Sequence, residues 1–192
     1  IAIASLVNVR KQQSFTGSAE VLYQPVKELT VRALLGVNSV GSFYEQYVPA
    51  QYNYSRYGIV RGYIFKSQAT SNFYNFDLSA SYMTKIGESI SSSTVVGMQG
   101  FLNNNYGISI EKDSFPSTSI TSIGSGNRYV GGTETFGDSR SAGLFVQEEL
   151  SLDDTYFFTL GLRNDYASSI GKDAASVFYP KFIGAIRLER VL

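Results

Sequence analysis

Apolar and polar residues alternate one by one over long stretches of this sequence, and this pattern most limits the folds available to it. The alternation is clearest at 30–40, 73–83 and 156–166. In the second stretch Tyr74 and Phe76 share one face of an extended chain, whereas Asn75 and Asp77 share the other. Because successive side chains of a β-strand point to opposite faces, each stretch predicts a strand with one apolar and one polar face.

The same pattern predicts seven long strands in an all-β fold. Short polar turns alternate along the chain with longer links, and several strands exceed the roughly 9–11 tilted residues that cross a bilayer. This layout is typical of outer-membrane barrels. We therefore expect an antiparallel meander of about seven strands in the wall of a transmembrane β-barrel. The strands are expected at 13–24, 29–42, 69–84, 89–108, 138–152, 155–168 and 176–190, the turns at 24–28, 84–88 and 152–155, and the longer loops at 43–68, 109–137 and 169–175.

The composition excludes several kinds of site. The chain has 14 Tyr and 13 Phe but no His and no Cys, and its 16 basic residues balance its 16 acidic ones. Without His or Cys there is no His-based triad, no thiol nucleophile and no common structural zinc site. A balanced charge gives no electrostatic support for nucleic-acid binding, and no apolar run approaches the roughly 20 residues of a membrane-spanning helix. We therefore expect no enzyme activity, no cofactor, no metal site and no nucleic-acid partner.

Two pairs of adjacent carboxylates have simple structural interpretations. Glu148 and Glu149 follow each other on a predicted strand, so their side chains point to opposite faces and cannot act together on one substrate. Glu149 is expected to share the lumen face with Gln147. Asp153 and Asp154 fall in a tight turn, where Asp is favoured because its side chain bonds the turn backbone.

Several segments resemble a known family of outer-membrane proteins. The strand and turn GLFVQEELSLDD (143–154), the strand and loop YFFTLGLRNDYASSIGKD (156–173) and the strand FYPKFIGAIRL (178–188) follow each other in the second half. The hairpin FTGSAEVLYQPVKELTVRALLGVN (15–38) precedes them. Together these segments resemble the barrel strands of TonB-dependent receptors, in particular the SusC/RagA family of TonB-linked outer-membrane proteins.

The resemblance implies a larger protein in the bacterial outer membrane. Members of this family have a barrel of about 22 strands with a plugged lumen, an N-terminal plug and a segment that engages TonB. They typically act with a surface lipoprotein of SusD type. We therefore expect residues 1–192 to be an incomplete β-barrel segment in contact with outer-membrane lipid, with the plug and the remaining strands lying outside it.

Four charged residues fall on the polar faces of predicted strands: Arg32, Asp77, Arg163 and Asp165. An Arg on the lipid face near the bilayer midplane destabilises a barrel by about 2–4 kcal/mol. The alternation of the strands therefore predicts that the four side chains face the lumen. Two roles remain open for them. We favour pairing with each other, with neighbouring strands or with the plug over direct contact with a solute.

The function that the resemblance implies is TonB-dependent uptake of a bulky solute, which is a glycan or oligosaccharide, a siderophore or a peptide. Aromatic and amide side chains of the long loops are the expected ligand contacts. Two alternatives remain open: a soluble all-β module that binds carbohydrate or another ligand, and a small complete outer-membrane barrel with a structural or adhesive role. The loop residues expected to bind ligand are Tyr47, Tyr52, Tyr54, Asn127 and Tyr129.

Overall fold

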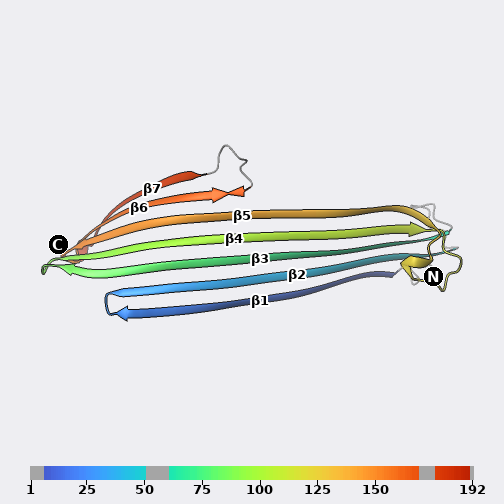
Figure 1. Cartoon of the computed structure of the whole chain (residues 1–192), viewed down its shortest axis with the longest axis horizontal. Helices are drawn as coiled ribbons and strands as arrows, with labels where there is room; N and C mark the ends of the chain where they lie inside the picture. The colour runs from blue at the N-terminus through green and yellow to red at the C-terminus, as the bar shows by residue number, and fades with distance from the viewer. Residues whose placement is uncertain (1–6, 51–60, 169–175, 191–192) are drawn as a thin grey trace. The chain divides into compact units, whose positions relative to one another are not determined.

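The computed structural model describes residues 7–50, 61–168 and 176–190, and the strands among them form one antiparallel sheet. Seven strands lie in the order in which they occur in the chain, so each strand pairs with the next (Figure 1). The prediction of an all-β meander of seven long strands is confirmed. Among the described residues, no helix is long and apolar enough to cross a membrane. The strands are β1 (Val7–Val26), β2 (Leu29–Ala50), β3 (Arg61–Ile86), β4 (Ile90–Asp113), β5 (Arg128–Leu152), β6 (Tyr156–Ala167) and β7 (Val177–Ile186).

Strands β1 to β5 are longer than predicted, and two of the expected long loops are wrong. Strands β6 and β7 are shorter than predicted, and β7 ends at Ile186 instead of residue 190. Strands β2 and β3 extend into the predicted loop 43–68 as far as Ala50 and back to Arg61. Strands β4 and β5 shorten the predicted loop 109–137 to residues 114–127. Gly, Ser, Asn and Tyr suggested irregular chain there, but backbone pairing between neighbouring strands continues without a regular apolar face. The third predicted loop, 169–175, lies outside the described residues.

The short turns lie where the sequence predicted them. Strand β1 ends at Val26 and β2 begins at Leu29, and β3 and β4 are joined across Gly87, whose φ is +70°. Between β5 and β6, Asp153 and Asp154 both have positive φ, at 53° and 50°. Asp tolerates this left-handed region better than most residues, so the acidic pair has the turn role expected of it.

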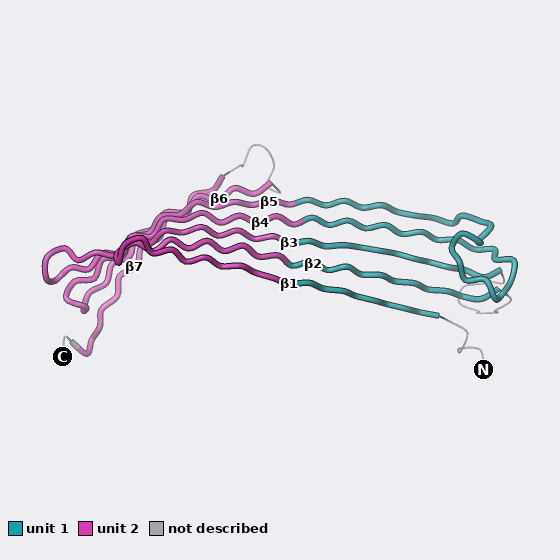
Figure 2. Tube along the Cα trace, turned by 60° about the horizontal axis from the view of Figure 1, so that its bottom comes forward, with its two compact units in different colours: residues 1–15, 38–72, 104–138 teal, residues 16–37, 73–103, 139–192 magenta. Residues whose placement is uncertain are grey.

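The chain divides into two compact units, which are coloured separately in Figure 2. Unit 1 comprises residues 1–15, 38–72 and 104–138, and unit 2 comprises residues 16–37, 73–103 and 139–192. Unit 1 contains a small hydrophobic core and unit 2 contains the hairpins with the clearest alternation. Each unit is described by itself below.

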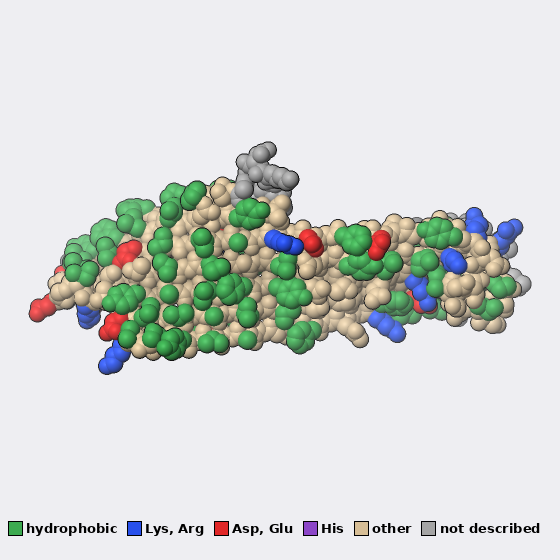
Figure 3. Space-filling view, in the orientation of Figure 1, with side chains coloured by type: hydrophobic (Ala, Val, Ile, Leu, Met, Phe, Trp, Pro, Cys, Tyr) green, Lys and Arg blue, Asp and Glu red, His purple; other side chains and the backbone are tan. Residues whose placement is uncertain are grey.

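Unit 2 has one polar face and one apolar face. The register between β5 and β6 places Phe145 opposite Arg163 and Glu149 opposite Thr159, which defines the polar face, and Glu148 opposite Leu160, which belongs to the other. Apolar side chains are widely spread over unit 2 in the space-filling view (Figure 3). Many are open to the surroundings: the large residues that alternate onto the apolar face and are at least 38% exposed include Val21, Tyr23, Leu35, Tyr74, Tyr82, Met98, Leu144, Val146, Tyr156, Phe158, Leu160, Leu162, Phe178 and Phe182.

Unit 1 contains the core of buried side chains, which comprises Tyr47, Ile64 and Phe115, with Ile120 and Ile123 packed against it. The Tyr47 and Phe115 rings meet edge to face, with centroids 6.0 Å apart. The segment 114–127 lies along the ends of the strands because its backbone is bonded there. Phe115 N donates to the carbonyl of Arg61 at 2.7 Å, and Asn127 N donates to that of Ser114 at 3.3 Å.

Candidate functional site

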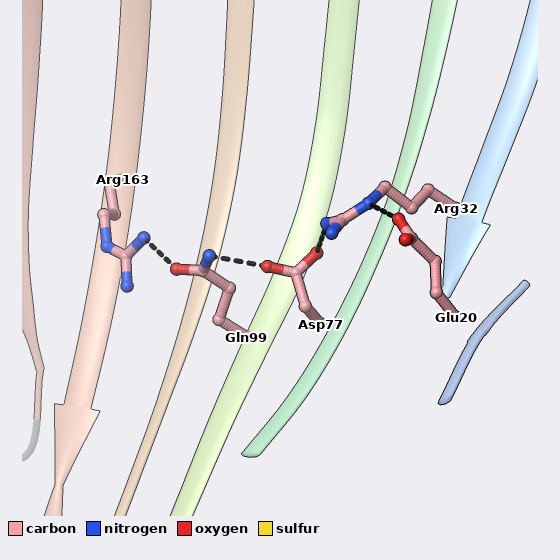
Figure 4. A network of polar contacts seen from close by, with 5 residues as sticks. All are labelled: Glu20, Arg32, Asp77, Gln99 and Arg163. Carbon is pink, nitrogen blue, oxygen red and sulfur yellow. Dashed lines mark hydrogen bonds and ion pairs between the residues drawn. The ribbon is translucent and has the colours of Figure 1, made fainter. Parts of the chain in front are cut away.

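A row of polar side chains crosses the polar face of unit 2, and we call it the polar ladder: Glu20, Arg32, Asp77, Gln99, Arg163 and Asp165. It begins on β1 and β2, where Arg32 Nε donates to Glu20 Oε1 at 2.5 Å. The other side of the same guanidinium reaches β3, with Arg32 Nη1 3.5 Å from Asp77 Oδ1. In Figure 4 five of these side chains point towards one another across the sheet.

The amide of Gln99 continues the polar ladder from β3 to β6. Its nitrogen donates to Asp77 Oδ2 at 2.7 Å, and its oxygen accepts from Arg163 Nη1 at 2.7 Å. Arg163 Nε then donates to Asp165 Oδ1 at 2.7 Å. Positive and negative groups thus alternate across the sheet, with the amide bridging a carboxylate and a guanidinium in the only orientation that satisfies both.

Glycines bring the ladder side chains close to the backbone. A Cβ atom added to Gly143 would collide with both Asp165 Oδ1 and Arg163 Nη2, and one added to Gly97 would collide with the Phe145 ring. Phe145 itself lies beside the ladder, with its ring centroid 6.0 Å from Arg163 Cζ. Residues without a side chain at these places let Arg163, Asp165 and Phe145 lie flat on the sheet.

A small cavity of about 230 Å³ opens beside the Arg163 end of the polar ladder. Gly161 lies in its lining, and Lys181 Nζ donates to Gln147 Oε1 at 3.0 Å within it. The cavity offers amide, ammonium and guanidinium groups next to the aromatic rings of Phe145 and Tyr179. Such a lining suits a polar solute that carries hydrogen-bonding groups.

All four predicted lumen residues, Arg32, Asp77, Arg163 and Asp165, are brought together by the polar ladder. Each of them contacts another ladder residue, and that they face a lumen stays a prediction. Glu20 and Gln99 were missed. Both lie in stretches where apolar and polar residues alternate only weakly. Counting residues from the neighbouring turns, two residues per repeat, was the only signal that could have placed them on the same face.

The predicted ligand residues of the loops have different positions. Tyr47 is only 3% exposed, and its hydroxyl donates to the carbonyl of Thr118 at 3.1 Å. That is the position of a core residue, so the expectation that Tyr47 contacts a ligand is corrected. Tyr129 is 61% exposed and Asn127 is also exposed, as ligand contacts must be. Tyr52 and Tyr54 lie outside the described residues.

An ion pair that the sequence did not single out closes the segment 114–127 of unit 1. Arg128 Nε donates to Asp113 Oδ1 at 2.7 Å, and Arg128 Nη2 bonds the second carboxylate oxygen. The hydrogen bond from Arg128 holds the pKa of Asp113 below its ordinary value, helped by the Ser114 hydroxyl and by the charges of Arg128 and Arg61. The two residues flank the segment, so the pair ties its ends together.

The polar groups of the ladder bind one another across the sheet of unit 2. The carboxylates of Glu20, Asp77, Glu148 and Asp165 accept hydrogen bonds from guanidinium, amide or hydroxyl groups. Within the described ranges, no group of three or more acidic residues could hold a metal ion.

Solved structures share this fold. The structure of the RagAB peptide transporter matches with a TM-score of 0.90 and 15% identity, over 97% of this chain and 21% of that chain. The RagAB peptide importer matches in its "open-open" state with a TM-score of 0.87 and 16% identity, over 94% of this chain and 20% of that chain. No protein-family model and no curated protein matches the chain. The chain thus spans about a fifth of the length of these solved chains, and at this identity the likeness shows a shared fold, that of a segment of a barrel wall.

Proposed function

We propose that this chain forms part of the wall of an outer-membrane barrel that takes up a bulky solute. The observation that carries the proposal is the two-faced sheet of unit 2. One face exposes large apolar side chains such as Leu160 and Phe182, at 53% and 73%, and the other face of the same strands carries the polar ladder. A single sheet with these two faces suits lipid on one side and a water-filled or plugged lumen on the other.

The strand lengths and the aromatic residues support the same proposal. Strands β1 to β5 have 20–26 residues, well beyond the usual 5–6 of globular sheets. Near the short turns, Tyr23, Tyr82 and Tyr156 alternate onto the apolar face and are exposed. Tyrosines at that level suit the interface between headgroups and acyl chains.

We further propose that uptake depends on TonB and on a SusD-type surface lipoprotein in the complete protein, as in the family that the sequence resembles. The polar ladder then lines the lumen and supports the wall, while exposed residues of unit 1, Asn127 and Tyr129, contact the cargo outside the membrane. The solved proteins with this fold are named as a peptide transporter and importer, so peptides are the first cargo class to test, ahead of oligosaccharides and siderophores. The proposed role involves no enzyme activity and no cofactor.

The experiment that tests this function is uptake by cells that produce the full-length protein. Cell fractionation first locates the protein. Fluorescent peptide and oligosaccharide mixtures are then supplied to cells in which TonB is present or deleted. We expect the protein in the outer membrane and accumulation of one mixture only when TonB is present. The variant Tyr129→Ala should reduce that uptake several-fold, because an exposed aromatic platform is lost. Tyr23→Ala, near the turn between β1 and β2, should not reduce it. TonB-independent accumulation, or recovery in the soluble fraction, contradicts the proposal.

The soluble binding module is the weaker alternative. It requires shorter strands and a second sheet to cover the apolar face, whereas the described residues form one sheet. No specific observation favours the small complete barrel either.

A further inference from the structure

The apolar face of unit 2 carries a carboxylate, Glu148, near the end of β5. Its cross-strand partner on β6 is Leu160, and Val146 and Leu150 flank it on the same face. The next residue, Glu149, points to the polar face opposite Thr159. A charged group among exposed apolar side chains needs a physical reason for its place.

Two hydroxyl groups of β4 hold the Glu148 carboxylate in position. Ser92 Oγ donates to Oε1 and Thr94 Oγ1 donates to Oε2, each at 2.5 Å. Among the described residues, no Lys or Arg forms an ion pair with Glu148, whereas the carboxylates of the polar ladder all have one within reach. The site therefore fixes a negative group and leaves the matching positive group to come from outside.

An apolar groove of about 570 Å³ begins at this carboxylate and runs towards β7. Leu160 and Phe182 are directly opposed across β6 and β7, and Leu162 is opposed to Pro180. Phe182 is 73% exposed, so the groove is open at this residue. Its lining is largely apolar and fits a hydrocarbon chain. Lys181 also borders the groove, and its ammonium group donates to Gln147 on the polar face.

The depth of Glu148 in the sheet suits the edge of a bilayer. It precedes Leu152, the last residue of β5, by four residues, which is about 13 Å at the usual rise per residue. With the strand tilt of about 35–45° in outer-membrane barrels, this is about 10 Å along the membrane normal. Headgroups extend roughly 5–7 Å beyond the hydrocarbon core on each side, so the carboxylate lies near their boundary with the acyl chains.

We propose that Glu148 and this groove form a binding site for one phospholipid with a primary-amine headgroup, such as phosphatidylethanolamine. The ammonium group donates to the carboxylate fixed by Ser92 and Thr94, and an acyl chain lies in the groove. Phosphatidylcholine has a cation without an N–H donor, so it cannot form this charge-assisted hydrogen bond. The inference rests on the proposed function, because it needs the apolar face to lie in a bilayer.

The test begins with the full-length protein and its variants Glu148→Gln and Glu149→Gln. Flotation with vesicles first establishes that each protein inserts into a bilayer. The purified proteins are then equilibrated with equal amounts of phosphatidylethanolamine and phosphatidylcholine of identical acyl chains, and the retained lipids are measured by mass spectrometry. Gln keeps the size of Glu and removes its charge, and position 149 provides a matched control on the opposite face of the same strand.

We expect the wild-type protein to retain the amine lipid about tenfold over phosphatidylcholine, as one charge-assisted hydrogen bond provides. Glu148→Gln should retain both lipids equally, and Glu149→Gln should behave as wild type. Phe182→Ala should retain less of both lipids with an unchanged preference. The lipid site is overturned if Glu148→Gln keeps the preference, or if the inserted wild type shows none. Failure to float with vesicles overturns the proposed membrane role itself, so the two failures are distinguishable.

Discussion

Arg163 is the side chain on which the polar ladder converges. It donates through Nε to Asp165 and through Nη1 to Gln99, and it lies 6.0 Å from the centre of the Phe145 ring. Its side chain is 35% exposed, so solvent screens these interactions and each contributes modestly. Their value lies in joining β4 and β6, which are not direct neighbours in the sheet, through one planar group.

Replacing Arg163 by Met should therefore destabilise unit 2 by about 1 kcal/mol, because Asp165 and Gln99 lose their donor while the side-chain volume is kept. The matched control is Arg140→Met. Arg140 is an exposed residue of β5 that forms no ion pair among the described residues. Urea unfolding of the full-length protein in vesicles measures both. Equal midpoints for the two variants would show that the polar ladder adds nothing to stability.

Gly143 lies beside the Arg163–Asp165 pair, and its lack of a side chain leaves room for that pair. Gly143→Ala should displace this pair and cost about 1 kcal/mol, and combining it with Arg163→Met should cost little more than either change alone. Gly184→Ala is the control, because a Cβ there meets no atom within 4 Å. Fully additive costs in the double variant would contradict the close approach that the glycine permits.

The turn between β5 and β6 is set by two consecutive left-handed residues. Asp153 and Asp154 have φ of 53° and 50°, and Thr155 N donates to the carbonyl of Leu152 at 2.9 Å. Positive φ at both central positions matches the twist of antiparallel strands and defines the register of the hairpin. That register decides which face of β6 carries Arg163.

Substitution at Asp154 tests this turn. Asp154→Gly should keep or raise stability because Gly adopts positive φ without a steric penalty. Asp154→Val should cost about 1–2 kcal/mol because a β-branched side chain is strained there. Thermal unfolding of the two full-length variants gives the comparison, and a valine variant as stable as the glycine variant would rule out the left-handed turn.

The segment 114–127 of unit 1 depends on a titratable contact at its base. Because Arg128 lowers the folded-state pKa of Asp113 below its ordinary value of 3.8, the ion pair stabilises the segment at any pH above that value. The contribution is lost as the pH falls through the lowered folded-state pKa. Neutral conditions therefore leave the pair intact.

Acid should accordingly release this segment only below pH 3.8. In limited proteolysis with an acid-tolerant protease, cleavage within 114–127 should stay slow down to that pH and rise below it. Asp113→Asn should be cleaved faster already at about pH 5, with a flatter pH dependence. Asp138→Asn, at an exposed carboxylate of the same unit, serves as the control. A cleavage rate of the wild type that does not change with pH would contradict the stabilisation of this segment by the ion pair.

Across the whole chain, the features predicted correctly are those that depend on the alternation of apolar and polar residues and on turn residues. Seven strands, their order and the common face of Arg32, Asp77, Arg163 and Asp165 follow from the two-residue period and from turn residues such as Asp153. Strand ends were misplaced where aromatic, Gly and Ser residues interrupt the period. Backbone ladders do not need an apolar face, so β2 to β5 continue beyond the last regular alternation.

Contacts between distant positions were not predictable in this way. The packing of Tyr47 against Phe115 joins positions far apart in the chain, and without it Tyr47 looks like an exposed loop aromatic. Gln99 is similar, because its role as a bridge depends on the side-by-side placement of Asp77 and Arg163. In both cases the local residue type suggests a role that only the pairing of the strands can decide.

The central claim, that the two faces of this sheet meet lipid and water, is tested most directly along β6. Spin labels on single cysteines at positions 157–163 of the full-length protein in vesicles report accessibility to oxygen, which concentrates in lipid, and to a water-soluble nickel complex. We predict a two-residue period, with oxygen maxima at Phe158, Leu160 and Leu162 and nickel maxima at Thr159, Gly161 and Arg163. An apolar face closed to both reagents, or open to nickel throughout, would contradict the account.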